Sequence, residues 1–189
     1  MTDETMGFFR DDTPPDVRRQ VLHALATAAM SDLERAKFYG LPDGCRMREG
    51  AKILSPENLI IGTNVWIGEN AVLDASGGLE IGSNTSIGLS VYLWTHDSHQ
   101  LNLSGNNIRE AKDQIRRRPV RIGSNCFIAG PSVLMPGTTI GDSCVIAPLS
   151  LVKSNLSDGT IYTPYRDFLK MDRRITAFEA RLAELESNA

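Results

Sequence analysis

The chain has 189 residues, of which 41% are hydrophobic, so it has room for one sizeable domain with a core and short appendages. Its formal net charge of -3 gives no sign of a nucleic acid or an anionic membrane surface as a partner. No apolar run approaches the ~18 residues of a spanning helix, the acidic N-terminus lacks the order of a secretory signal, and the 3 cysteines have no zinc-type spacing.

Two helices are predicted in the N-terminal segment, residues 1–44. Pro14 begins a stretch in which apolar residues follow one another at helical spacing. Ser31 and Glu34 form a capping box, which predicts the start of a second, short helix. His23 falls on the first helix, where we expect it to be a surface or packing residue.

An aliphatic residue recurs every six positions in two blocks that are separated by a gap. The recurring residues are Ile61, Ile67, Leu73, Ile81, Ile87, Leu93, Ile122, Ile128, Leu134, Ile140, Ile146 and Val152. A period of six fits neither a helix nor an isolated hairpin. It fits a solenoid of short parallel strands in which equivalent side chains stack ~4.7–4.9 Å apart. We assign residues 45–160 to this solenoid and expect a bulge at 76–78 to absorb a two-residue slip in the phase.

Residues 95–119 interrupt the repeat with a long polar stretch. We expect an irregular surface loop that carries function, because structureless loops of this length are otherwise uncommon. The loop ends in Arg116, Arg117 and Arg118. These cations could meet phosphates of a ligand, or they could form an ordinary solvated basic run.

Residues 161–189 are predicted to form an amphipathic helix at the C-terminus. Apolar residues recur there at heptad spacing, namely Phe168, Met171, Ile175, Phe178, Leu182 and Leu185. Since a solvated apolar seam is costly, we expect this helix to pack on its own solenoid or on a neighbouring subunit.

Three stretches stand in a fixed order along the chain: ASGGLEIG at 75–82, THDSH at 95–99, and RPVRIGSNCFIAGPSVLMPGTTIGDSCVI at 118–146. Together with the six-residue period they resemble the hexapeptide-repeat family, and within it the maltose, galactoside, nodulation-factor and polysaccharide O-acetyltransferases. The resemblance implies a mainly β fold, a left-handed parallel β-helix flanked by helices. It also implies a homotrimer that binds coenzyme A between subunits.

The same resemblance implies that His96, which follows the last strand before the loop, is the catalytic base. Acyl transfer from a thioester to a hydroxyl needs a base that takes the hydroxyl proton, and an imidazole that is mostly neutral at pH 7 suits this task. Asp97 could orient the His96 ring or bind the acceptor, and the alternative with equal weight is that it is a solvated aspartate in a turn. Trp94 and His99 are further candidate substrate contacts, and His99, in an extended segment, would face away from His96.

Coenzyme A contacts are implied at five positions. Gly130, Pro148, Lys153 and Ser154 align with family positions in the later coils, and Arg166 closes the family's C-terminal motif. The lysine is displaced by one position, and the glycine that precedes Arg166 in the family is absent. We expect Lys153 and Arg166 to contact phosphates, and the alternative is that both are ordinary surface cations.

We therefore expect a cytoplasmic acyltransferase that uses acetyl-CoA, without a metal, to acetylate a hydroxyl (or an amine) of a sugar, nucleotide sugar or surface-polysaccharide precursor. Gly68 stands where the disaccharide enzymes carry a sugar-binding asparagine, which argues against a simple disaccharide as acceptor. The alternative is a catalytically silent trimeric scaffold or binding protein.

Overall fold

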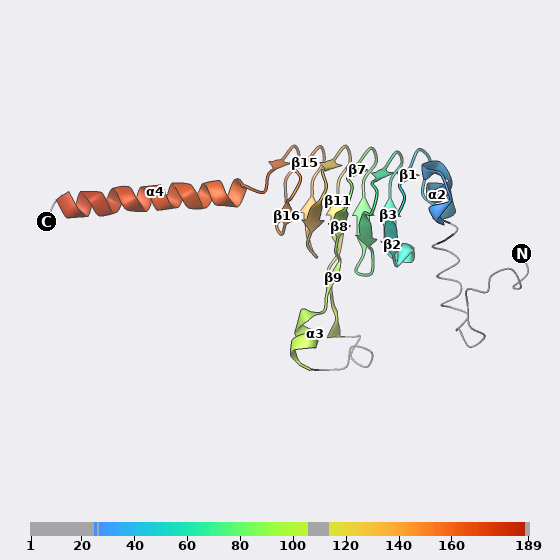
Figure 1. Ribbon diagram of the computed structural model, residues 1–189, viewed down its shortest axis with the longest axis horizontal. Coiled ribbons are helices and arrows are strands. Elements are labelled where there is room, and N and C mark those ends of the chain that lie inside the picture. Colours follow the sequence, from blue (N-terminus) through green and yellow to red (C-terminus); the bar gives the residue numbers. More distant parts are fainter. Residues whose placement is uncertain (1–24, 26, 106–113, 188–189) are drawn as a thin grey trace, which may run out of the picture.

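The computed structural model describes Leu25, residues 27–105 and residues 114–187, and it gives only the backbone at 166–173, 182 and 186–187. The molecule is an elongated stack of coils from which a ribbon leaves at the side and a long helix leaves at one end (Figure 1). His23 and most of the first predicted helix lie outside the described residues.

The coils are built from three parallel sheets, which are called sheets A, B and C below. Sheet A contains β1 (Arg46–Met47), β4 (Trp66–Ile67), β7 (Ser86–Ile87), β12 (Phe127–Ile128), β15 (Val145–Ile146) and β17 (Ile161–Tyr162). Sheet B contains β2 (Lys52–Leu54), β5 (Val72–Asp74), β8 (Val91–Leu93), β13 (Ser132–Leu134) and β16 (Leu151–Val152). Sheet C contains β3 (Leu59–Ile61), β6 (Leu79–Ile81), β11 (Val120–Ile122) and β14 (Thr139–Ile140). This arrangement confirms the predicted parallel β-helix, and its left-handed winding stays an expectation from the resemblance.

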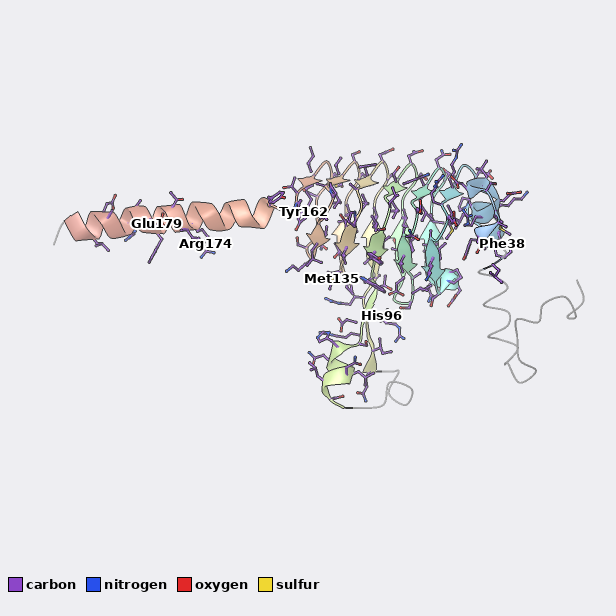
Figure 2. All side chains as sticks on the ribbon, in the orientation of Figure 1. Phe38, His96, Met135, Tyr162, Arg174 and Glu179 are labelled. Carbon is purple, nitrogen blue, oxygen red and sulfur yellow. The ribbon has the colours of Figure 1, made fainter. Side chains whose placement is uncertain are left out.

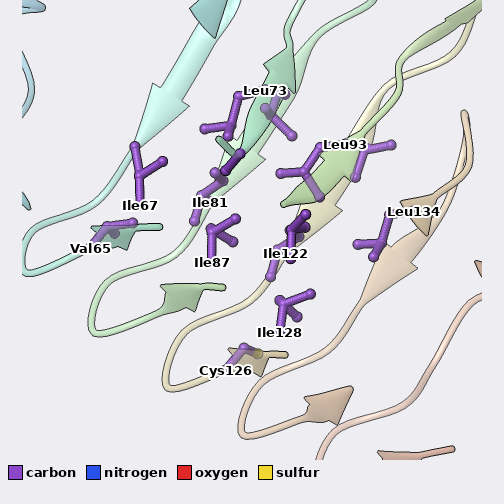
Figure 3. Packing of buried hydrophobic residues seen from close by; sticks show 14 of the residues in the cluster. Val65, Ile67, Leu73, Ile81, Ile87, Leu93, Ile122, Cys126, Ile128 and Leu134 are labelled. Carbon is purple, nitrogen blue, oxygen red and sulfur yellow. The ribbon is translucent and has the colours of Figure 1, made fainter. Parts of the chain in front are cut away.

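The predicted aliphatic rows form the core of the coils (Figure 3). In sheet B, Leu73 pairs with Leu93, and Leu93 pairs with Leu134. All three side chains are fully buried, as are Ile67 and Ile87 in sheet A. Each such side chain contributes roughly 1.5–3 kcal/mol by leaving water, so the repeat itself stabilises the fold.

The corners that lead from sheet C to sheet A repeat a Gly-x-Asn pattern. Asn64, Asn84 and Asn125 have φ angles of 56°, 56° and 59°, which lie in the left-handed region that asparagine tolerates better than most residues. The Nδ2 of Asn64 also donates to the Oδ1 of Asn84 at 3.2 Å. The sequence therefore determines the corners as well as the rows.

Helix α2 (Asp32–Phe38) covers the N-terminal end of the stack and begins at the predicted capping box. Ser31 accepts from the backbone N–H of Glu34, and the Glu34 side chain accepts from the backbone N–H of Ser31, which confirms the prediction. The buried guanidinium of Arg35 donates to the carbonyl oxygen of Met47 in β1 at 2.7 Å. It also donates to the carbonyls of Thr27 and Met30, at 2.8 and 2.5 Å, so one side chain ties the helical segment to the first coil.

The segment at 95–119 is more regular than we expected. It starts with β9 (His96–Asp97), continues into the short helix α3 (His99–Leu103), and returns through β10 (Arg116–Arg117). Strands β9 and β10 pair antiparallel, so the part of the segment that the structure describes forms a two-stranded ribbon. The expectation of an irregular loop was wrong because a two-residue strand is too short to show a period in the sequence.

The coil continues across this insertion without a change of register. Val120 pairs with Leu79, and Ile122 pairs with Ile81, although the whole ribbon lies between β8 and β11 in the sequence. The insertion therefore occupies a corner between sheets B and C and leaves the core rows intact.

Helix α4 (Arg166–Ser187) projects from the C-terminal end of the stack rather than lying along it (Figure 1). Ile175, Phe178 and Leu185 on its apolar seam are 51%, 67% and 63% exposed. Of the two packing surfaces expected for this helix, its own solenoid is therefore ruled out, and packing on a neighbouring subunit stays a prediction. None of the helices in the described part of the chain is long and apolar enough to cross a membrane.

Candidate active site

His96 lies where the ribbon leaves the coils, one corner after β8 (Figure 2). Its side chain is 32% exposed, so it is held by the protein on one side and open on the other. The rings of Trp94 and His96 meet edge to face with centroids 6.2 Å apart, and Tyr92 stacks on Trp94 at 6.2 Å. The three rings follow one another at alternate positions, as expected for one face of an extended strand.

A carboxylate from the preceding coil contacts the His96 ring. Nδ1 of His96 lies 2.7 Å from Oδ2 of Asp74, which is the last residue of β5 and is fully buried. Ser76 places its Oγ 3.1 Å from the same ring nitrogen. Asp74 lies just before the corner at 76–78, where a bulge was expected to absorb the two-residue slip, and Ser76 begins that corner.

Asp74 is held by a set of donors that favour its charged form. The backbone N–H and the hydroxyl of Thr95 donate to Oδ2 at 2.9 and 3.0 Å, and the backbone N–H of Ser76 donates to Oδ1 at 3.0 Å. Burial alone would raise the pKa of Asp74, but the hydrogen bonds from Thr95, Ser76 and His96 outweigh it and lower the pKa to about 2. The carboxylate is therefore ionised throughout the neutral range.

The charge on Asp74 decides which nitrogen of His96 can act as a base. An ionised carboxylate only accepts hydrogen bonds, so the Nδ1 that contacts it carries a proton. In the neutral imidazole the lone pair then lies on Nε2. His96 is thus oriented to accept a proton at Nε2, the ring nitrogen that does not contact Asp74.

The other two candidate substrate contacts in this segment lie close to each other. Oδ1 of Asp97 is 3.2 Å from Nδ1 of His99, and Oδ2 of Asp97 is 3.8 Å from Nη2 of Arg118. Among the described contacts it is Asp74, and not Asp97, that orients the His96 ring. His99 begins α3 rather than lying in an extended segment, so the reason that we gave for its facing away from His96 was wrong.

Asp74 was missed in the sequence because it stands 22 positions before His96. The register of the coils could have indicated this contact. Leu73 and Leu93 are paired in adjacent coils, so Asp74, which follows Leu73, lies at the same corner as Trp94, which follows Leu93. A charged residue directly after a core leucine, one coil before a candidate base, is the pattern that would have indicated it.

An open hollow of about 430 Å³ lies beside this corner. Its lining residues come from two successive corners between sheets B and C and from β3, namely Glu57, Asn58, Ile60, Ser76, Gly77 and Gly78. Asn58 ends the 3₁₀ turn η2 (Pro56–Asn58), and Ser76 also contacts the His96 ring. The hollow therefore offers polar groups next to the residues that hold His96.

The positions expected to bind coenzyme A lie at two different corners of the coil. Gly130 and Pro148 occupy equivalent places between sheets A and B, two residues after the paired Ile128 and Ile146. A Cβ added to Gly130 would overlap the backbone carbonyl of Leu89, so the coil itself requires a glycine there. Close packing of the backbone thus explains Gly130 without any ligand.

Lys153 and Ser154 are exposed and lie between sheets B and C, directly after β16. The β9–β10 ribbon leaves the stack at the equivalent corner two coils earlier in the chain. Lys153 is the residue equivalent to Met135 and Trp94 in those earlier coils, because each of the three follows a paired core residue. Arg166 instead begins α4, beyond the last strand of sheet A. A single chain therefore presents Lys153 and Ser154 on the side of His96, and Gly130, Pro148 and Arg166 away from that corner.

Comparison with known proteins agrees with the repeat. Residues 119–147 match the family described as "Hexapeptide repeat of succinyl-transferase". The chain is 30% identical over 112 residues to "Putative colanic acid biosynthesis acetyltransferase WcaF" of Escherichia coli (strain K12), a match that covers 58% of this chain and 56% of that relative. The chain thus spans little more than half of the length of that curated relative.

Solved structures agree with the fold. The hexapeptide-repeat containing acetyltransferase VCA0836 from Vibrio cholerae has a TM-score of 0.63 and 24% identity, over 79% of this chain and 87% of that one. The same protein is also known in complex with acetyl coenzyme A, with a TM-score of 0.54 and 22% identity, over 79% of this chain and 85% of that one. A galactoside acetyltransferase in complex with coenzyme A has a TM-score of 0.57 and 21% identity, over 78% and 77% of the two chains. The chain therefore carries hexapeptide repeats, and its coils have the fold of the hexapeptide-repeat acetyltransferases.

Proposed function

We propose that the protein transfers an acetyl group from acetyl-CoA to a hydroxyl or amine of a sugar-containing acceptor, with His96 as the general base. The observation that carries the proposal is the 2.7 Å contact between Nδ1 of His96 and the buried, ionised Asp74. This contact directs the basic Nε2 away from Asp74 and holds the ring in place. The sugar-related names of the similar proteins support the same class of acceptor.

With a hydroxyl acceptor, the acceptor gives its proton to Nε2 of His96 while its oxygen attacks the carbonyl carbon of the thioester. The C–S bond then breaks, and the proton passes from Nε2 to the sulfur, so that free coenzyme A and the acetyl ester leave. Asp74 stabilises the imidazolium that exists between these steps. Because a thioester is already activated, the reaction needs no covalent enzyme intermediate.

Coenzyme A is expected to bind along the later coils, between neighbouring subunits of a homotrimer. Lys153 and Arg166 would hold its phosphates, with Ser154, Gly130 and Pro148 lining the path. The placement of these residues at two corners of one chain supports a site shared between subunits, since a second chain can bring its own corner next to His96. Lysine and arginine suit phosphate because charge-assisted hydrogen bonds are strong.

The acceptor is expected beside the corner that holds His96. The hollow lined by Glu57, Asn58 and Ser76 supplies groups that hydrogen-bond to sugar hydroxyls, and Trp94 supplies an aromatic face. A Cβ at Gly68 would lie 2.5 Å from the backbone carbon of Gly88, so the asparagine of the disaccharide enzymes does not fit at this position. This supports an activated sugar or a polysaccharide precursor rather than a simple disaccharide.

The proposal is tested by measuring thiol release from acetyl-CoA against a panel of sugars, sugar phosphates and nucleotide sugars. We expect at least one acceptor to raise thiol release well above the rate in its absence. If the folded protein binds acetyl-CoA but no member of the panel is acetylated, a sugar acceptor is excluded. If the protein does not bind acetyl-CoA at all, the scaffold alternative is the correct one.

His96→Asn should lower turnover with the best acceptor by roughly 10²–10⁴-fold, the usual contribution of a general base, while the melting temperature stays close to that of the unaltered protein. His99→Asn is the matched control and should cause a much smaller loss. Equal losses in the two variants, or a loss in His99→Asn alone, would show that His96 is not the base.

A further inference from the structure

The β9–β10 ribbon sets an arginine directly opposite the proposed base. Arg117 is the backbone partner of His96, and Arg116 is the backbone partner of Asp97. Residues that face each other in an antiparallel pair project to the same side, with Cβ atoms about 4.5–5.5 Å apart. Arg117 therefore shares the face of the ribbon that carries His96.

Arg116 and Arg118 belong to the opposite face. Successive side chains in a strand alternate, so the two residues that flank Arg117 project away from its side. The ion pair between Arg118 and Asp97, at 3.8 Å, agrees with this assignment, since Asp97 is the cross-strand partner of Arg116. The three consecutive arginines are thus not equivalent, and only one of them shares the side of the base.

Arg117 is exposed, so a ligand can reach it. It already has an interaction within the chain, but a guanidinium has five N–H donors and can serve a protein partner and an anion together. Its planar fork matches the oxygens of a phosphate or a carboxylate. A neutral sugar ring would gain little from a cation at this position.

We propose that Arg117 binds an anionic group, a phosphate or a carboxylate, of the acceptor beside the hydroxyl that His96 deprotonates. The inference rests on the proposed function and narrows its acceptor to acidic sugars: sugar phosphates, nucleotide sugars or uronic acids. The phosphates of coenzyme A offer the same chemistry, and the experiment separates the two sources.

The experiment measures binding by calorimetry with the full chain, using acetyl-CoA and three probes that differ in charge: glucose, glucose 1-phosphate and glucuronic acid. The unaltered protein should bind both anionic probes more tightly than glucose. Arg117→Gln should weaken their binding by roughly tenfold or more, as expected for a lost charge-assisted hydrogen bond, and Arg117→Lys should restore part of it. Arg116→Gln, on the opposite face, should change it by less than about threefold.

Three results would overturn the inference. The first is equal affinity of the unaltered protein for glucose and for the two anionic probes. The second is an equal loss in Arg116→Gln and Arg117→Gln, which would indicate only a general positive field. The third is a loss of acetyl-CoA affinity in Arg117→Gln with probe binding unchanged, which would assign Arg117 to coenzyme A. Because these are binding measurements, they remain informative even if thiol release disproves the proposed reaction.

Discussion

The stacked coils and the β9–β10 ribbon use their side chains in opposite ways. In the coils, the row of Leu73, Leu93 and Leu134 is completely buried, whereas Arg116 and Arg117 of the ribbon are exposed. His96 belongs to both regions, because its ring contacts Asp74 in a coil and its backbone pairs with the ribbon. Stability therefore comes mainly from the buried rows of the coils, and the proposed chemistry comes from side chains at the corners and on the ribbon. Variants should therefore separate the two properties.

The largest effect on stability is expected from Leu93→Ala. Leu93 is fully buried in the coil from which the ribbon leaves, and removing a buried leucine side chain costs about 2–5 kcal/mol. Urea denaturation at a fixed protein concentration measures the loss, since assembly adds to apparent stability. Leu103→Ala in α3 is the control, because Leu103 is 79% exposed and its loss should change stability by less than about 0.5 kcal/mol. Similar losses of stability in the two variants would show that the coils and the ribbon contribute equally to the stability of the fold.

The next effect is expected from Asp74→Asn, which should lower turnover by roughly 10²-fold. An amide can donate to Nδ1 of His96 and so favour the tautomer whose Nε2 carries the proton and cannot act as a base. Steady-state kinetics should show the loss in kcat with KM for acetyl-CoA unchanged. Asp97→Asn should lower turnover far less. A larger loss of turnover in Asp97→Asn than in Asp74→Asn would show that Asp97 orients the His96 ring.

Asp74→Asn also has an expected signature in acid. The pKa of Asp74 in the folded protein is about 2, below the value of about 3.9 for an unfolded aspartate. The ionised carboxylate therefore stabilises the fold above about pH 3.9, and this contribution is lost as the pH falls from about 3.9 to about 2. Unfolding measured across this range should be less dependent on pH in the variant than in the unaltered protein.

A smaller effect is expected from Lys153→Ala and Arg166→Ala. Each should weaken acetyl-CoA binding several-fold, and the difference should be larger at low salt, because contacts with phosphate are partly Coulombic. Calorimetry at two salt concentrations measures it, with Lys52→Ala in β2, at the far end of sheet B, as a control cation. Unchanged affinity in both variants would remove these residues from the cofactor site.

The smallest effect on the coils is expected from truncation after Arg166. The removed helix does not lie along its own solenoid, so the coils should keep their fold, while the assembly should dissociate more readily. We expect the assembly to weaken because Ile175 and Phe178 are exposed on α4, and an apolar seam at heptad spacing can pack against the same helix of another copy of the chain. Light scattering over a range of concentrations tests this, and Ile175→Ser combined with Phe178→Ser should reproduce it. An unchanged assembly in both proteins would deny the helix any structural role.

The coils were predictable because their rule is local and repeated. Every sixth residue had to be aliphatic for the rows of Leu73 and Leu93 to stack, and the capping box of Ser31 and Glu34 needed only four consecutive residues. The contact between Asp74 and His96 depends instead on which corners lie above one another. The sequence offered only its neighbour Asp97 as a candidate to orient the ring, with acceptor binding and a solvated turn as alternatives, and the register of the coils identifies Asp74 instead.

The ribbon and helix α4 were less predictable for different physical reasons. The alternation that would indicate β9 and β10 has only two residues in each strand, so it cannot be told from chance. The apolar seam of α4 was evident in the sequence. An amphipathic pattern predicts that one face of a helix packs against another surface, but it does not identify that surface. The sequence therefore left two surfaces open, its own solenoid and a neighbouring subunit, and the structure rules out the first.

The unbroken register across the ribbon has an evolutionary consequence. Val120 continues the row of Leu79 as if nothing had been inserted, so the corner after β8 accommodates this segment without a change of register in the neighbouring coils. Such a corner is a replaceable module: segments can be lengthened, shortened or exchanged there while the rows of sheet B keep Asp74 in its place. New acceptor preferences can then arise in this segment by insertion and deletion, while the buried rows of the coils stay under selection for packing.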